Sequence, residues 1–209
     1  DIQLETPKNE RRTKLDSGFR VMSSKIGSIS LVGFVIQQKD AITLSGITKE
    51  INGRIMELYM NQNKDQIGLE LDAQSTPIFG IAESFFNFTA MRSHSESEGK
   101  MKSDEQVPQF ILNTGIYASK SNIDFNLLWK YVSSYESTRF LATVKGQPIV
   151  PEPLGGFHSL SAIIGWSFGK KHQTRAYIEF RNLLDKKFST VVGYPDFGRI
   201  ITVGIKSAV

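Results

Sequence analysis

The chain has 209 residues, of which 40% are hydrophobic and 22% charged, a balance typical of a folded domain and unlike a disordered chain. Its formal net charge is +4, but the lysines and arginines are scattered among acidic residues, without a basic run that suits a nucleic-acid backbone. The absence of cysteine excludes disulfides, zinc–thiolate sites and cysteine nucleophiles. We therefore expect one domain that does not bind nucleic acid.

Neither a transmembrane helix nor a secretion signal is predicted. No window approaches the roughly 18 uninterrupted apolar residues that a transmembrane helix needs. The chain opens at Asp1 without a basic and apolar leader, so we expect any secretion signal to lie outside this sequence. A membrane β-barrel remains open as a class, because alternating strands keep the mean hydropathy low, here −0.21.

Apolar and polar residues alternate with a period of two in segment after segment, which predicts an all-β chain. The first two segments alternate loosely, and the pattern becomes clearer toward the C-terminus. The pattern predicts about nine strands, of which the first and the last run toward the same side. In chain order, the predicted strands are 13–22, 28–37, 66–74, 79–91, 107–118, 123–131, 159–168, 174–181 and one that follows Gly198.

Four of these segments, 66–74, 123–131, 159–168 and 174–181, alternate cleanly enough to assign two faces. One face carries aliphatic and aromatic side chains, and the other carries polar ones. If the apolar faces meet lipid, the polar faces line a lumen, where we expect a hydrated wall of ion pairs that could also contact a plug or a substrate. The charged residues of this predicted polar wall are Glu70, Asp72, Asp124, Lys130, Arg175, Glu179 and Arg181.

The predicted connections alternate between tight turns and long polar loops, as in outer-membrane barrels whose long loops are extracellular. Aromatic and cationic groups in such loops often bind ligands, so Tyr135, Arg139 and Tyr194 are our candidate ligand-binding residues. The tight turns are expected near 25–27, 76–79, 119–122 and 169–172, and the long loops near 39–52, 94–106, 134–156 and 182–198.

Strand length and aromatic placement favour a membrane barrel. Several predicted strands reach about ten residues, which is enough to cross a bilayer at a tilt of roughly 45°. The rings of Trp129, Tyr131, Trp166 and Phe168 lie toward the ends of their apolar faces, where membrane barrels carry aromatic girdles. Two alternatives share the alternation: a soluble β-sandwich binding module with an aromatic core, and a smaller outer-membrane barrel with a structural or adhesive role.

The segment from Tyr177 to Arg199 resembles the penultimate strand and last loop of TonB-dependent outer-membrane receptors. That family shows an Asn-Leu-Phe-Asp-Lys-x-Tyr motif there, followed by a Pro-Gly-Arg-type entry into the final strand. Weaker similarities are Gly68-Leu-Glu-Leu71 and Val107-Pro-Gln with Leu112-Asn113, and Val209 stands where the family has an aromatic residue. The matching residues are Asn182, Leu183, Asp185, Lys186, Gly198 and Arg199, and the departures are Leu184, Phe188 and Phe197.

The resemblance implies an antiparallel transmembrane β-barrel segment in the bacterial outer membrane. About nine strands are too few for the 22 strands of an outer-membrane transporter, so we expect residues 1–209 to be the C-terminal portion of a larger barrel, with the plug domain absent from this chain. The family further implies TonB-dependent uptake of a scarce nutrient, such as an iron–siderophore complex. Its partners would be outer-membrane lipid, the N-terminal plug, the remaining barrel strands and TonB.

Catalytic and metal sites are not predicted. The histidines His94, His158 and His172 lack the spacing of a metal site. His158 and Ser159 are neighbours in a predicted strand, where adjacent side chains point to opposite faces and cannot share one site. We therefore expect a protein that is not an enzyme and that holds no metal or cofactor.

Overall fold

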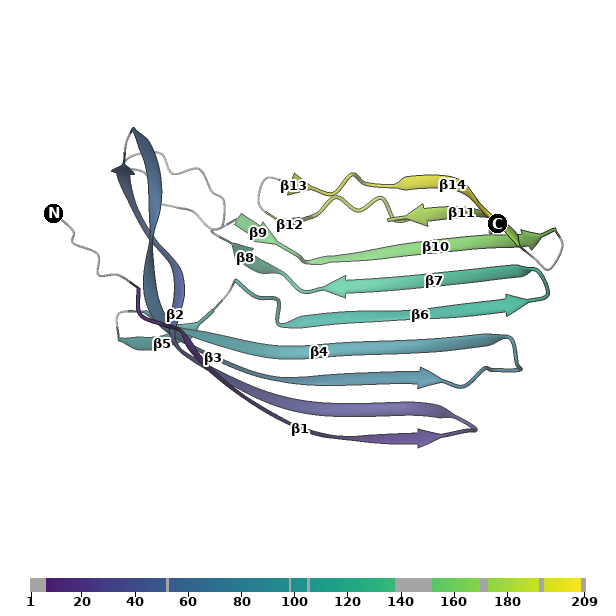
Figure 1. The fold of residues 1–209 in the computed structure, drawn as a ribbon, viewed down its shortest axis with the longest axis horizontal. Helices are drawn as coiled ribbons and strands as arrows, with labels where there is room; N and C mark the ends of the chain where they lie inside the picture. The colour runs from purple at the N-terminus through teal and green to yellow at the C-terminus, as the bar shows by residue number, and fades with distance from the viewer. Residues whose placement is uncertain are drawn as a thin grey trace.

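The computed structural model describes residues 7–51, 53–97, 99–104, 106–137, 152–169, 173–191 and 194–207. These residues form a ten-stranded antiparallel sheet in which each strand of one continuous path pairs with the next, while β5 (Lys100–Ser103) pairs with β4 (Figure 1). The path consists of β1 (Arg11–Ser23), β2 (Gly27–Ile51), β3 (Arg54–Ser75), β4 (Ala82–Ser97), β6 (Phe110–Lys120), β7 (Ile123–Val132), β10 (Phe157–Phe168), β11 (Thr174–Arg181) and β14 (Ile200–Ser207).

The all-β, antiparallel prediction is confirmed, as is the number of strands in the path. Two further pairs of short strands lie at one end of the sheet: β8 (Tyr135–Ser137) with β9 (Glu152–Leu154), and β12 (Ser189–Val191) with β13 (Tyr194–Pro195). No helix in the described part of the chain is long and apolar enough to span a bilayer.

The strand register separates two faces, because directly paired residues of an antiparallel sheet point to the same side. We call these the apolar face and the polar face. Residues that pair directly from strand to strand form a row across the sheet, and two adjacent rows show how the faces differ in polarity. One row of the apolar face contains Phe19, Leu31, Leu71, Phe88, Leu112, Tyr131 and His158. The next row, on the polar face, contains Arg20, Ser30, Asp72, Asn87, Asn113, Lys130 and Ser159.

The apolar face is exposed over the whole width of the sheet, and no large side chain of the described residues is fully buried. A β-sandwich buries its apolar face against a second sheet, so this arrangement contradicts the sandwich alternative. A water-soluble chain rarely exposes a contiguous apolar surface of this extent. Its exposed members include Leu15, Phe19, Val35, Ile67, Leu69, Ile116, Ile164, Trp166, Ile178, Val203 and Ile205.

The two ends of the sheet differ in their connections, and we call them the turn end and the loop end. At the turn end, β1 joins β2 and β6 joins β7 through tight turns, as predicted (Figure 1). At the loop end, the prediction of a long loop over 39–52 was wrong, because β2 and β3 continue as a paired ribbon to Ile51 and Arg54. Strands also occupy parts of the loops predicted over 94–106, 134–156 and 182–198.

Two register shifts explain why this ribbon was not recognised. They fall between Gln38 and Ala41 and between Leu44 and Thr48, where β2 carries extra residues relative to β3. Each shift interrupts the two-residue period on which the sequence prediction relied. The segment is nevertheless rich in isoleucine and threonine, which favour strands.

Candidate membrane surface and polar wall

The register places all seven residues of the predicted polar wall on the polar face. Glu70 and Asp72 lie on β3, Asp124 and Lys130 on β7, and the remaining three on β11. Asp72 and Lys130 belong to one row of directly paired residues. Gly165 of β10 pairs with Asp124 on one side and with Tyr177 of β11 on the other, so these residues also share a face. The three charged residues of β11 are an even number of positions from Tyr177 and therefore point to the same side. These residues therefore share one surface. The assignment of this surface to a lumen stays a prediction.

An ion pair joins β7 and β11 across the intervening strand β10. The Arg175 guanidinium donates from Nε to Asp124 Oδ1 at 2.8 Å and from Nη2 to Asp124 Oδ2 at 2.5 Å. This two-bond geometry is the strongest form of an arginine–carboxylate contact. The pair passes over Gly165, where an added Cβ would collide with both side chains. Glycine at this position is therefore what lets the two charges meet.

The other charged residues of the polar face interact more locally. Arg181 donates to Glu179 at 2.6 Å along the same strand, and Asn87 donates to Asp72 at 2.6 Å across one strand pair. Glu70 and Lys130 are exposed on the same face. Because Arg181 is largely exposed, its ion pair adds little stability. The Asp124–Arg175 pair is the best-defined contact of this wall.

Aromatic rings on the polar face lie over glycines of the paired strands. Packing a ring over a cross-strand glycine covers backbone that would otherwise be bare and fixes the register of the two strands. A Cβ added at any of these glycines would strike the ring. The three pairs are Phe34 with Gly68, Phe85 with Gly115, and Tyr177 with Gly204.

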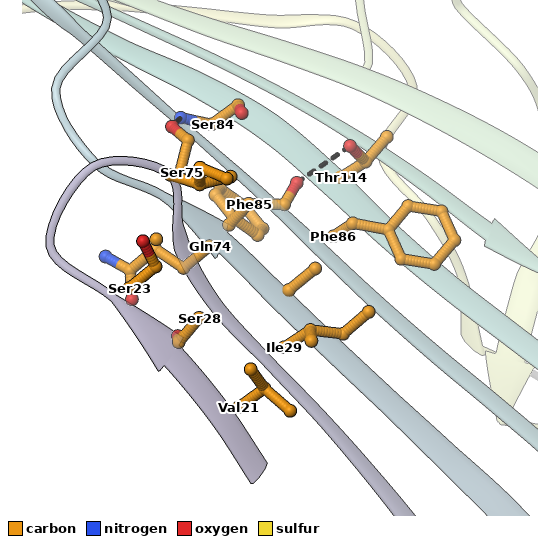
Figure 2. Close-up of a pocket in the computed structure, with 13 residues that line it drawn as sticks. Val21, Ser23, Ser28, Ile29, Gln74, Ser75, Ser84, Phe85, Phe86 and Thr114 are labelled. Carbon is orange, nitrogen blue, oxygen red and sulfur yellow. Dashed lines mark hydrogen bonds between the residues drawn. The ribbon is translucent and has the colours of Figure 1, made fainter.

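A shallow hollow of about 540 Å³ lies at the turn end of β1 to β6, and its main residues belong to the apolar face (Figure 2). Val21, Ile29 and Phe86 line it, together with Ala73 and several serines. The Thr114 hydroxyl donates to the Phe85 carbonyl at 2.8 Å, so this polar group is satisfied within the sheet. The hollow is part of the exposed apolar surface and was not predicted from the sequence.

The predicted ligand-binding residues lie at the loop end, apart from Arg139, which falls outside the described residues. The Tyr135 hydroxyl donates to the Thr190 carbonyl at 3.0 Å and so links the β8–β9 pair to the β12–β13 pair. Burial raises the pKa of the Tyr135 phenol. Tyr194, on β13, is 73% exposed. The structure thus gives Tyr135 a structural contact and leaves Tyr194 on the surface.

The motif that resembles the receptor family has a clear structural role. The Asn182 side chain is almost fully buried, with 4% exposure, accepts a hydrogen bond from the Lys186 amide at 3.1 Å and donates to the Lys186 carbonyl at 2.9 Å. Asp185 then accepts from the Arg199 amide at 2.9 Å. These contacts fold the chain back after β11 and hold the entry to β14. Val209 lies outside the described residues.

No family model and no curated protein sequence matches the chain, but solved structures do. One is titled as the copper transporter OprC, with a TM-score of 0.72, 17% identity, and coverage of 97% of this chain and 32% of that chain. A second is the FrpB iron transporter from Neisseria meningitidis, with a TM-score of 0.71, 14% identity, and coverage of 98% and 32%. A third is the siderophore receptor PirA from Acinetobacter baumannii, with a TM-score of 0.66, 17% identity, and coverage of 95% and 32%.

At these identities the likeness concerns the fold. The chain spans about a third of the length of the solved structures that it matches. All three are transporters or receptors and not enzymes. The match covers nearly all of this chain. The chain therefore has the fold of one portion of the β-barrel of TonB-dependent outer-membrane receptors.

Proposed function

We propose that residues 1–209 are the C-terminal portion of the barrel of an outer-membrane transporter, and that a longer receptor supplies the plug and the other strands. The observation that carries this proposal is the apolar face, which has exposed large apolar side chains on every strand of the path except β4, where they are half-buried. In a bilayer, that face would meet lipid, and every backbone group would need a partner within the barrel.

The direction of the two edge strands supports a larger assembly. Both β1 and β14 run from the loop end to the turn end. In an antiparallel barrel, neighbouring strands run in opposite directions, so these two edges cannot close on each other in that pattern. In the described part of the chain, no strand covers the outer edge of either one. Further strands would therefore complete the wall.

We also propose that the full-length receptor takes up a scarce nutrient, such as an iron–siderophore complex, with energy supplied through TonB. The matched structures support uptake of a metal or its chelate, since they are those of a copper transporter, an iron transporter and a siderophore receptor. The candidate ligand contacts are Tyr135 and Tyr194, at the loop end, and Arg139. The polar wall would face the plug.

Uptake by the full-length receptor tests this function. A strain that lacks the receptor should accumulate less radiolabelled iron from ferric siderophores, and a plasmid copy should restore uptake only in a strain with functional TonB. Copper and free ferric citrate serve as alternative cargoes in the same assay. Restoration that does not depend on TonB would contradict the proposed energy source, and an unchanged uptake of every cargo would contradict the transport role.

Thiol labelling tests the orientation of the sheet. This sequence contains no cysteine, so single cysteines can be introduced at neighbouring positions of β10. We expect a water-soluble maleimide to label Ser159→Cys, on the polar face, in intact outer membranes. Leu160→Cys, on the apolar face, should be labelled only after detergent is added. Equal labelling of the two variants would contradict a lipid-facing apolar surface.

A further inference from the structure

A polar notch interrupts the sheet at the loop end, between the end of β5 and the beginning of β6. It has a volume of about 280 Å³ and is lined mainly by polar side chains of β4, β5 and the connection that follows β5. The notch exists because β5 pairs with β4 only from His94 onward, whereas β6 pairs with β4 only up to Ala90. The intervening part of β4 is therefore flanked by the connection between β5 and β6.

The notch lies at the boundary of the apolar surface. Along β4, the residues of the apolar face change from Phe86, Phe88 and Ala90 to Arg92 and His94 within one step of the pleat. Ser103 pairs with His94 and so has the same orientation. On the proposed outer-membrane location, this would be the depth at which a side chain leaves the hydrocarbon region and reaches lipid headgroups.

The acidic group of the notch is already engaged within the protein. Asp104 has a side chain that is 9% exposed and lies 3.9 Å from Lys64 Nζ. Its two oxygens also accept from the Gln106 amide at 3.1 Å and the Ser93 hydroxyl at 3.3 Å. In contrast, Arg92 is exposed and makes no ion pair within the described part of the chain. The notch therefore presents an uncommitted guanidinium.

Charged side chains are more numerous at the loop end of the apolar face than at its turn end. At the loop end, Arg11 and Lys39 are basic paired neighbours on this face, whereas Asp65, opposite His94, and Glu96, one pleat step beyond His94, are acidic. At the turn end, the corresponding positions of most strands carry glycine or small hydroxyl residues, and Lys120 is the basic exception. Basic groups next to a bilayer attract anionic lipid headgroups.

We infer that the notch binds a phosphate group of a membrane lipid in the leaflet at the loop end. Arg92 would hold two phosphate oxygens, as its planar donors match that geometry, and His94, Ser103 and Gln109 would supply further hydrogen-bonding groups. The acyl chains of the same lipid would lie along the exposed apolar face below. This inference rests on the proposed outer-membrane location.

Native mass spectrometry of the full-length receptor in detergent tests this site. The probe is diphosphoryl lipid A, compared with its dephosphorylated form and with inorganic phosphate. We expect the wild-type receptor to bind diphosphoryl lipid A, and Arg92→Gln to weaken that binding about tenfold, as expected when one charge-assisted contact is lost. Lys120→Gln is the matched control, because it removes a basic group from the same face at the turn end, and it should leave binding unchanged.

Three results would overturn the inference: equal weakening by Lys120→Gln, equal binding of dephosphorylated lipid A, or displacement of the lipid by an equal concentration of inorganic phosphate. The last result would indicate a site for soluble anions. Heat-modifiable migration on gels reports barrel formation independently. A wild-type receptor that forms no barrel would contradict both this inference and the proposed function. A folded Arg92→Gln barrel that binds diphosphoryl lipid A as tightly as the wild type would contradict this inference alone.

Discussion

The two faces of this sheet are built from the same strands but follow different packing rules. On the polar face, rings cover glycines and an ion pair crosses a whole strand, so single atoms have defined neighbours. On the apolar face, side chains project outward with few defined partners. Where the surrounding medium is lipid, it can fill the gaps between apolar side chains, so hydrophobicity matters more than shape on that face. We expect the polar face to be sensitive to volume and the apolar face to charge.

The largest expected effect is that of a charge on the apolar face. Ile164→Arg, in the middle of the apolar residues of β10, should destabilise the folded receptor in lipid vesicles by up to about 4 kcal/mol, because the guanidinium would lie at the bilayer midplane. Its neighbour Ile163 points to the polar face, so Ile163→Arg is the control and should cost much less. Denaturant unfolding followed by tryptophan fluorescence measures both. Equal costs would mean that the two faces meet the same medium.

Added volume on the polar face should have the next largest effect. Gly165→Val would place methyl groups where Asp124 and Arg175 meet, and we expect a loss of about 3 kcal/mol in the free energy of unfolding. Gly33 is the control, because a Cβ there has no neighbour closer than 3.8 Å, and it lies on the apolar face. Gly33→Val should change the unfolding midpoint little. A Gly165 variant as stable as the Gly33 variant would contradict the packing contrast.

The loop-end motif should show a smaller, local effect. Asn182→Ala removes the buried amide that bonds both backbone groups of Lys186, which should cost about 2 kcal/mol. Lys186→Ala retains those backbone groups and should be nearly neutral. Hydrogen exchange of the Lys186 amide provides the measurement, with faster exchange expected only in the Asn182 variant. Unchanged exchange would show that the turn is held by other contacts.

The smallest expected effect concerns Tyr135. Tyr135→Phe removes the hydrogen bond to Thr190 and should cost about 1 kcal/mol, whereas the exposed Tyr194 should tolerate the same change. Burial raises the pKa of Tyr135 above its usual 10.0, so the folded state favours the neutral phenol. Its contribution to stability should be complete below pH 10 and decline as the pH rises through the raised pKa. Unfolding curves of wild type and Tyr135→Phe should therefore converge at high pH, and a constant difference would contradict this.

The strands and their faces could be predicted from sequence because alternation is a local signal. Glu70 and Asp72 sit between apolar neighbours on β3, and the register places them on the face that this pattern indicated. The contact between Asp124 and Arg175 could not be predicted, since it joins residues 51 positions apart and depends on the register of three strands. The same holds for Tyr135 and Thr190, whose contact needs two hairpins to meet.

The ribbon formed by β2 and β3 was hidden by its irregularities. Asp40 adopts a positive φ of 56° at the first register shift, a local conformation that alternation cannot reveal. Composition alone marked the segment as polar, and polarity suggested a loop. A ribbon beyond the sheet can be polar on both sides, because neither side has to meet lipid.

On the proposed function, that ribbon divides the chain into a part that has to fit a bilayer and a part that has to fit only water. With 25 residues, β2 would extend on the order of 80 Å if straight, far more than the roughly 25 Å of an apolar belt. Its tip near Gly53 is thus the natural place to insert an epitope for surface labelling. On the proposed outer-membrane location, the same remoteness would let the sequence of the tip, which an antibody would meet first, change without altering the wall beneath it.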